Sequence, residues 1–183
     1  MSGPLRMDLD VPDRLRLPFT FEPARLLRDL ASLEASSWID HFVTSNYEGR
    51  WTVIPLRAPL GTEDAHPILQ ISSHPSEGDF VDTTVLDGCT YFAHVLAALG
   101  FPLGAARLMR LDPGSVIRTH VDADLSFDQG WVRLHVPVTT NPDVEFLVNG
   151  EPVTMREGEC WYLRLSDPHS VRNGGTLPRV HIV

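Results

Sequence analysis

The most informative absence from this 183-residue sequence is lysine, since all 15 basic residues are arginine. A chain without lysine has no Walker A lysine for nucleotide phosphates, no lysine to form a Schiff base with pyridoxal phosphate, and no amine nucleophile. A GC-rich genome would produce the same deficit with no functional meaning. In either case, any anionic ligand must be bound by arginine, histidine, hydroxyl groups or backbone amides.

Cysteine and long apolar runs are also scarce. Cys89 and Cys160 form no CxxC pattern, which argues against a disulfide scaffold or a cysteine zinc site and favours two small buried side chains in a reducing cytoplasm. The longest apolar run, residues 91–103, is interrupted by polar and helix-breaking residues and is too short for a membrane span of about 20 residues. Residues 1–13 contain no apolar core, so we expect no secretory signal.

Positive charge is in deficit, with 24 acidic residues and a net charge of −9. This balance would repel a phosphate backbone, so we expect no nucleic acid as a partner. The shortness of the longest apolar run argues against a membrane as a partner. Hydrophobic residues make up 43% of the chain and charged residues 21%, as in ordinary globular proteins. The length suits one domain over residues 1–183.

The pattern along the chain changes near residue 104. Residues 1–20 are expected to form an arm or edge strand, and residues 22–103 to supply helical support and loops. Within this support, apolar spacing predicts helices over about 22–35 and 88–99, a short strand over 51–56, and a long loop over 57–79.

From residue 104 to 183, short β-rich runs alternate with turn signals, and Asn149-Gly150 is the strongest hairpin signal. About seven or eight such strands, with the helices grouped before them, predict a mainly β fold of the jelly-roll type, a cupin-like double-stranded β-helix. Residues 104–183 would be its barrel core.

One candidate metal site is formed by His120, Asp122 and His169. Residues i and i+2 of a strand share a face, so His120 and Asp122 would converge. A jelly roll can bring a histidine 47 residues further on to the same point. Two imidazoles and one carboxylate form the facial triad of non-haem Fe(II) oxygenases, which leaves positions open for a chelating co-substrate and O₂. Chance surface residues, or a structural His169, remain the alternative.

Three further residues could bind an anion in the same barrel. Arg179, ten residues past His169, could hold the far carboxylate of 2-oxoglutarate, or lie at the surface. Arg133 and His135 share one strand face and would be costly to bury unless they line a pocket; an exposed edge strand is the alternative. Arg118 shares the face of His120 and could line the same cavity. His181 shares a strand face with Arg179 and could support the same site. The other four histidines are expected at the surface or on a helix face: His41, His66, His74 and His94.

The ordered motifs resemble the aspartyl/asparaginyl β-hydroxylase family, which includes bacterial free-proline cis-hydroxylases. The resemblance covers roughly residues 20–183 and rests on four runs: RLMRLDPGSVIRTHVDADL, WVRLHVPVTTNP, NGEPVTMREGECWYLRLSDPHSVRNGG and PRVHIV. It implies a double-stranded β-helix that uses Fe(II), O₂ and 2-oxoglutarate to hydroxylate an amino-acid side chain, free or in a peptide, releasing succinate and CO₂. Some members of the family lack the carboxylate ligand of the metal. Because this chain has Asp122 at that position, it is more similar to the bacterial branch, which has the complete triad.

Residue by residue, the resemblance implies His120, Asp122 and His169 as iron ligands and Arg179 as the anchor of 2-oxoglutarate. It places His135 beside the co-substrate, and Arg133 beside the co-substrate or a substrate carboxylate. Two readings from other classes stay open: a non-catalytic metal-binding cupin-type sensor or binding module, and a zinc-dependent isomerase or hydrolase.

Overall fold

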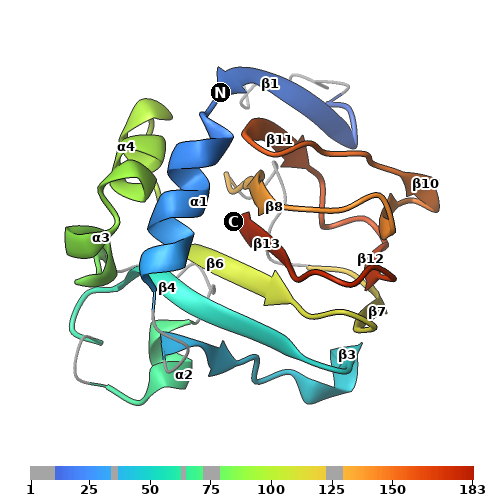
Figure 1. Ribbon diagram of the computed structural model, residues 1–183, viewed down its shortest axis with the longest axis horizontal. Helices are drawn as coiled ribbons and strands as arrows, with labels where there is room; N and C mark the ends of the chain where they lie inside the picture. The colour runs from blue at the N-terminus through green and yellow to red at the C-terminus, as the bar shows by residue number, and fades with distance from the viewer. Residues whose placement is uncertain (1–10, 34–36, 63–64, 72–78, 123–129) are drawn as a thin grey trace, which may run out of the picture.

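Two β-sheets face each other, and helices cover the outer surface of the larger one (Figure 1). The computed structural model describes residues 11–33, 37–62, 65–71, 79–122 and 130–183. Among these, no helix is long and apolar enough to cross a membrane.

The larger sheet has eight strands in the order β1-β11-β8-β13-β6-β4-β2, with β5 paired to β4. Its pairings are antiparallel throughout. The strands are β1 (Arg14–Thr20), β2 (Ile39–Asp40), β4 (Trp51–Pro59), β5 (Phe80–Asp82), β6 (Ala106–Leu111), β8 (Arg133–Thr139), β11 (Glu159–Leu163) and β13 (Arg179–Ile182).

The smaller sheet has five strands in the order β10-β9-β12-β7-β3. In both sheets, strands far apart in the sequence are neighbours, as β13 and β6 are. This arrangement is the expected jelly roll. The strands are β3 (Tyr47–Glu48), β7 (Val116–His120), β9 (Val144–Val148), β10 (Glu151–Pro152) and β12 (His169–Asn173).

The helices lie before residue 104, as expected. The helix predicted over 88–99 is present as Thr90–Ala98, and a separate short helix, Val85–Gly88, precedes it. Part of the loop predicted over 57–79 is strand and helix, because β4 continues to Pro59 and a short helix follows. The helical segments are α1 (Pro23–Ser32), η2 (Thr44–Asn46), α2 (Pro67–Gln70), α3 (Val85–Gly88) and α4 (Thr90–Ala98).

Asp29 on α1 is a buried carboxylate. Its carboxylate accepts hydrogen bonds from the backbone N–H groups of Tyr91 and Phe92, at 2.7 and 2.9 Å. These donors belong to the first turn of α4, where a helix has no internal acceptor for them. Asp29 therefore joins the two helices that cover the sheet.

The apolar core has two layers. One lies between the helices and the larger sheet and includes Leu26, Phe92 and Leu108. The other lies between the sheets and includes Met109 and Val171. Because strand side chains alternate, β6 contributes to both layers, and its odd-numbered residues face the space between the sheets.

Candidate active site

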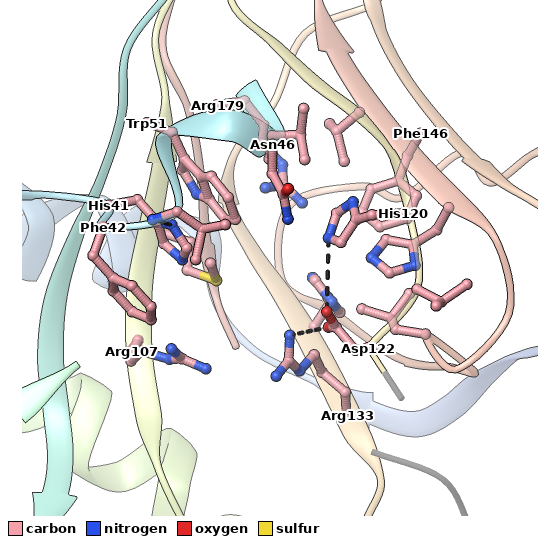
Figure 2. Close-up of a pocket in the computed structure, with 18 residues that line it drawn as sticks. His41, Phe42, Asn46, Trp51, Arg107, His120, Asp122, Arg133, Phe146 and Arg179 are labelled. Carbon is pink, nitrogen blue, oxygen red and sulfur yellow. Dashed lines mark hydrogen bonds and ion pairs between the residues drawn. The ribbon is translucent and has the colours of Figure 1, made fainter. Parts of the chain in front are cut away.

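A cavity of about 380 Å³ opens between the two sheets. Its walls combine apolar side chains with an unusual number of ionisable ones, and Figure 2 shows these side chains converging. Of the seven residues that the sequence placed at this site, all but Arg118 line the cavity: His120, Asp122, Arg133, His135, His169 and Arg179.

Two histidines meet across paired strands. His120 ends β7 and His169 begins β12, and the two are directly opposed in the antiparallel register, with ring centroids 4.2 Å apart. Asp122 follows two residues after β7, and its backbone N–H donates to the carbonyl of Leu165 at 2.8 Å. One ligand atom from each of His120, Asp122 and His169 lies within 4.8 Å of the other two.

Backbone carbonyls fix the orientation of both imidazoles. His120 Nδ1 lies 2.8 Å from the carbonyl of Arg118, and His169 Nδ1 lies 3.0 Å from that of Asp167. A carbonyl oxygen only accepts, so each neutral ring carries its proton on Nδ1 and leaves the Nε2 lone pair free. Metal-binding histidines are oriented in this way.

The carboxylate of Asp122 has two different environments. Its Oδ2 accepts a hydrogen bond from Arg133 Nη1 at 2.6 Å, and its Oδ1 lies 3.7 Å from His120 Nε2. Arg133 therefore holds one oxygen while the other faces the imidazoles (Figure 2). Burial lowers the pKa of His169, which favours the neutral ring that metal binding requires.

These donors fit a divalent transition metal. Two imidazole nitrogens and one carboxylate oxygen on one side of an ion leave its other positions open, the arrangement typical of non-haem Fe(II) oxygenases. Catalytic zinc sites also use two histidines and one carboxylate.

A buried arginine lies at one end of the cavity. Arg179 is 2% exposed, and its Nη2 donates to His181 Nδ1 at 2.8 Å. Its guanidinium carbon lies 5.6 Å from the ring centroid of Phe146, and its Nε has no partner among the described residues. Burial lowers the pKa of Arg179 to about 9. An anion at this position would offset the cost of burying the charge.

His135 lies beside this arginine and stays uncharged. Its Nδ1 is 3.4 Å from His181 Nδ1, and its Nε2 is buried without a partner in the described part of the chain. Burial, reinforced by the charge of Arg179, holds the pKa of His135 well below the usual histidine value.

Sequence reasoning missed two ionisable residues of this cavity, His41 and Arg107. His41, expected at the surface, is buried and stacks on Trp51 with ring centroids 3.6 Å apart. Arg107 on β6 is also buried and lines the cavity. A charged residue within the apolar run AARLMRL could have identified Arg107, as it identified Arg133. The stacking of His41 had no comparable signal.

Other residues lie elsewhere. Arg118 pairs with Glu48 at 2.9 Å and does not line the cavity, because the register of β7 against β12 shifts between Ile117 and His120 and breaks the expected alternation. His66 accepts from the backbone N–H of Ile68, and His94 stacks on Tyr91. His74 lies outside the described residues.

The fold and the site define a class, a double-stranded β-helix with two histidines and a carboxylate at the mouth of an arginine-containing barrel. Residues 26–183 match the family described as Aspartyl/Asparaginyl beta-hydroxylase. The chain belongs to this family.

Known relatives agree with this assignment. An L-proline cis-4-hydroxylase of Rhizobium meliloti (strain 1021) is 26% identical over 167 residues, covering 89% of this chain and 56% of the relative. The chain thus spans just over half the length of that relative.

Solved structures share the fold. A 2OG-Fe(II) oxygenase family oxidoreductase from Burkholderia pseudomallei aligns with a TM-score of 0.60 and 15% identity, over 93% of this chain and 83% of the other. A Pseudomonas putida prolyl-4-hydroxylase aligns with a TM-score of 0.56 and 12% identity, over 96% and 92%. At these identities the likeness concerns the fold, and it confirms the predicted double-stranded β-helix.

Proposed function

We propose that the protein is an Fe(II)- and 2-oxoglutarate-dependent dioxygenase that hydroxylates an amino-acid side chain. One observation carries the proposal: a convergent set of two histidines and a carboxylate shares a cavity with a buried arginine that has no anionic partner among the described residues. Membership of the β-hydroxylase family supports the same activity.

Each residue has a defined part in this proposal. His120, Asp122 and His169 would hold Fe(II), and Arg179 would bind the far carboxylate of 2-oxoglutarate. Iron held there would supply O₂ activation: one oxygen atom would enter succinate as 2-oxoglutarate loses CO₂, and the other would enter a substrate C–H bond. Arg133 orients Asp122 through its Oδ2, and the apolar walls exclude water.

The substrate proposed is a small amino acid of the proline, aspartate or asparagine type. The relative named L-proline cis-4-hydroxylase makes L-proline the first compound to examine.

The test is succinate formation after anaerobic loading with Fe(II) and 2-oxoglutarate, followed by admission of air with a panel of free amino acids and short peptides. We expect succinate that depends on iron, with one or more acceptors hydroxylated in proportion. His169→Ala should abolish succinate, while His94→Ala, a histidine on α4 outside the cavity lining, should not.

Wild-type protein that binds the metal tightly and melts at a higher temperature with it, yet forms no succinate with or without an acceptor, would contradict the proposal. That outcome would favour the non-catalytic metal-binding module.

A further inference from the structure

Arg107 is a buried cation to which the proposed reaction assigns no role. It is 4% exposed, and its Nη1 donates to the carbonyl of Ile71 at 2.8 Å. Among the described residues, its Nε has no hydrogen-bond partner and no carboxylate forms an ion pair with it, since Asp122 pairs with Arg133 instead. A buried guanidinium that lacks a counter-charge is costly unless an anion binds to it.

This position is separate from that of Arg179. Burial is the main cause that lowers the pKa of Arg107, to about 9. The next largest effects on this pKa come from the charges of Arg133 and Asp122. Arg179 instead contacts His181, and burial alone lowers its pKa. Figure 2 shows the Arg107 guanidinium directed towards Arg133, away from the end of the cavity that holds Arg179. The cavity therefore offers two positions for anions.

A stack of flat rings lies beside Arg107 in the cavity wall. His41 packs between Trp51, at 3.6 Å between centroids and 6° between planes, and Phe42, at 5.0 Å and 11°. Burial, followed by the charge of Arg107, lowers the pKa of His41 to about 4, so its ring is neutral at pH 7. The buried Nε1 of Trp51 has no partner among the described residues. This wall combines apolar area with unused N–H donors.

We propose, building on the proposed function, that Arg107 binds the carboxylate of the substrate. The substrate is then a small free acid, whose body packs against the rings of Trp51 and His41 opposite the metal ligands. The cavity volume of about 380 Å³ is at the low end for ligand pockets, and 2-oxoglutarate takes part of it. A free α-carboxylate suits this position, whereas the peptide bond that replaces it inside a chain carries no charge.

The first test leaves the protein unchanged. The amino acid that gives the most succinate and hydroxylated product is compared with its carboxamide and with a peptide in which the same residue is internal. We expect kcat/KM to fall by at least about 50-fold for both, as is typical for loss of a charge-assisted hydrogen bond in a buried site. Equal turnover of the acid and the carboxamide would overturn the inference, as would a peptide preferred over every free acid.

The second test replaces the guanidinium. Arg107→Gln should raise the Kd of the best acid by about 50-fold or more in a tryptophan-fluorescence titration, while the Kd of 2-oxoglutarate stays within about twofold. Arg107→Lys should restore part of the binding. Arg110→Gln is the matched control, because Arg110 lies on the same strand but pairs with Asp112. Thermal melting of each variant shows that it is folded.

The outcomes separate the two proposals. If wild-type protein loaded with Fe(II) and 2-oxoglutarate forms no succinate, the proposed function is wrong. Succinate formation with unchanged acid binding in Arg107→Gln, or with weakened 2-oxoglutarate binding instead, overturns only the role of Arg107. Failure of every free amino acid to bind to wild-type protein also overturns it.

Discussion

His120 and His169 are directly opposed on β7 and β12, with their ring centroids 4.2 Å apart. The pairing of these two strands, which is fixed by the fold, therefore places the two imidazoles next to each other. Each ring is then oriented by a backbone carbonyl two residues before it. A site built on paired strands in this way is preorganised for a metal.

Removing either imidazole should abolish specific metal binding. We expect His120→Ala and His169→Ala to weaken Fe(II) binding by more than about 100-fold, because ligand loss costs more than loss of a supporting hydrogen bond. Anaerobic calorimetric titration with Fe(II) measures this, with His94→Ala as the control. Unchanged affinity in both variants would show that the metal binds elsewhere.

Arg133 is predicted to act on the metal through Asp122. Arg133→Leu removes the 2.6 Å hydrogen bond to Oδ2 and leaves Asp122 free to rotate. We expect Fe(II) affinity to fall by about 10–100-fold, the usual effect of removing a partner of a ligand. The same titration checks it, and an affinity equal to that of wild type would rule out this orienting role.

Arg179 is predicted to determine the affinity for 2-oxoglutarate. Arg179→Gln should raise the Kd of 2-oxoglutarate by about 10–100-fold, since charged hydrogen bonds contribute roughly 1.5–3 kcal/mol each. Metal affinity should be unchanged. Arg172→Gln, an exposed arginine on β12, is the control. A Kd that does not respond to Arg179→Gln would mean that the co-substrate binds another residue.

Stability should fall in mild acid. The pKa values of His41, His135 and His181 are lowered in the folded protein, chiefly by burial, while in the unfolded chain each is about 6.5. Below about pH 6.5 the unfolded state therefore binds more protons than the folded state. The free energy of unfolding is then highest above about pH 6.5 and falls as the pH is lowered. For His41 this loss continues down to about pH 4, where its ring becomes protonated in the folded protein as well. Each of these histidines lowers the free energy of unfolding by up to about 1.4 kcal/mol for every pH unit of this fall.

Urea unfolding between pH 7.5 and 5, with a chelator present, measures this loss. His41→Phe keeps an aromatic ring in the stack but removes one titrating group, so its stability should depend less steeply on pH. A free energy of unfolding that stays constant over this range would contradict the burial of neutral histidines.

Gly158 should tolerate no side chain. It has a φ of +79°, and a Cβ there would lie 2.1 Å from the carbonyl oxygen of Phe21, whose N–H donates to Gly158. Gly158→Ala should destabilise the fold by more than about 3 kcal/mol, through both strain and steric clash. Gly150 has a similar φ of +78° with open space around it, so Gly150→Ala should cost only about 1 kcal/mol. If urea unfolding shows that the two substitutions lower the free energy of unfolding equally, the close approach of Phe21 does not limit the residue at position 158.

Alternation along strands made much of the site predictable. It placed Arg133 and His135 on one face, and both line the cavity. The meeting of His169 with His120 followed from the fold expected, not from local sequence, since only the jelly roll pairs β12 with β7.

Residues whose environment depends on distant contacts could not be placed in this way. His41 is buried because Trp51 and Phe42 cover its two faces, and nothing in the surrounding sequence indicates that stack. Asp29 is buried because the first turn of α4 offers unpaired N–H groups to it. Alternation predicts that Arg118 shares a strand face with His120, but the β7–β12 register shifts between Ile117 and His120, and Arg118 pairs with Glu48 on a neighbouring strand. In each case a tertiary partner outweighed the local pattern.

The most direct test of the account is a crystal structure grown without oxygen in the presence of Fe(II) and 2-oxoglutarate. We expect one ion bound by Nε2 of His120, Nε2 of His169 and a carboxylate oxygen of Asp122, with the far carboxylate of 2-oxoglutarate on Arg179. An ion bound away from these three side chains, or a co-substrate directed away from Arg179, would contradict the account.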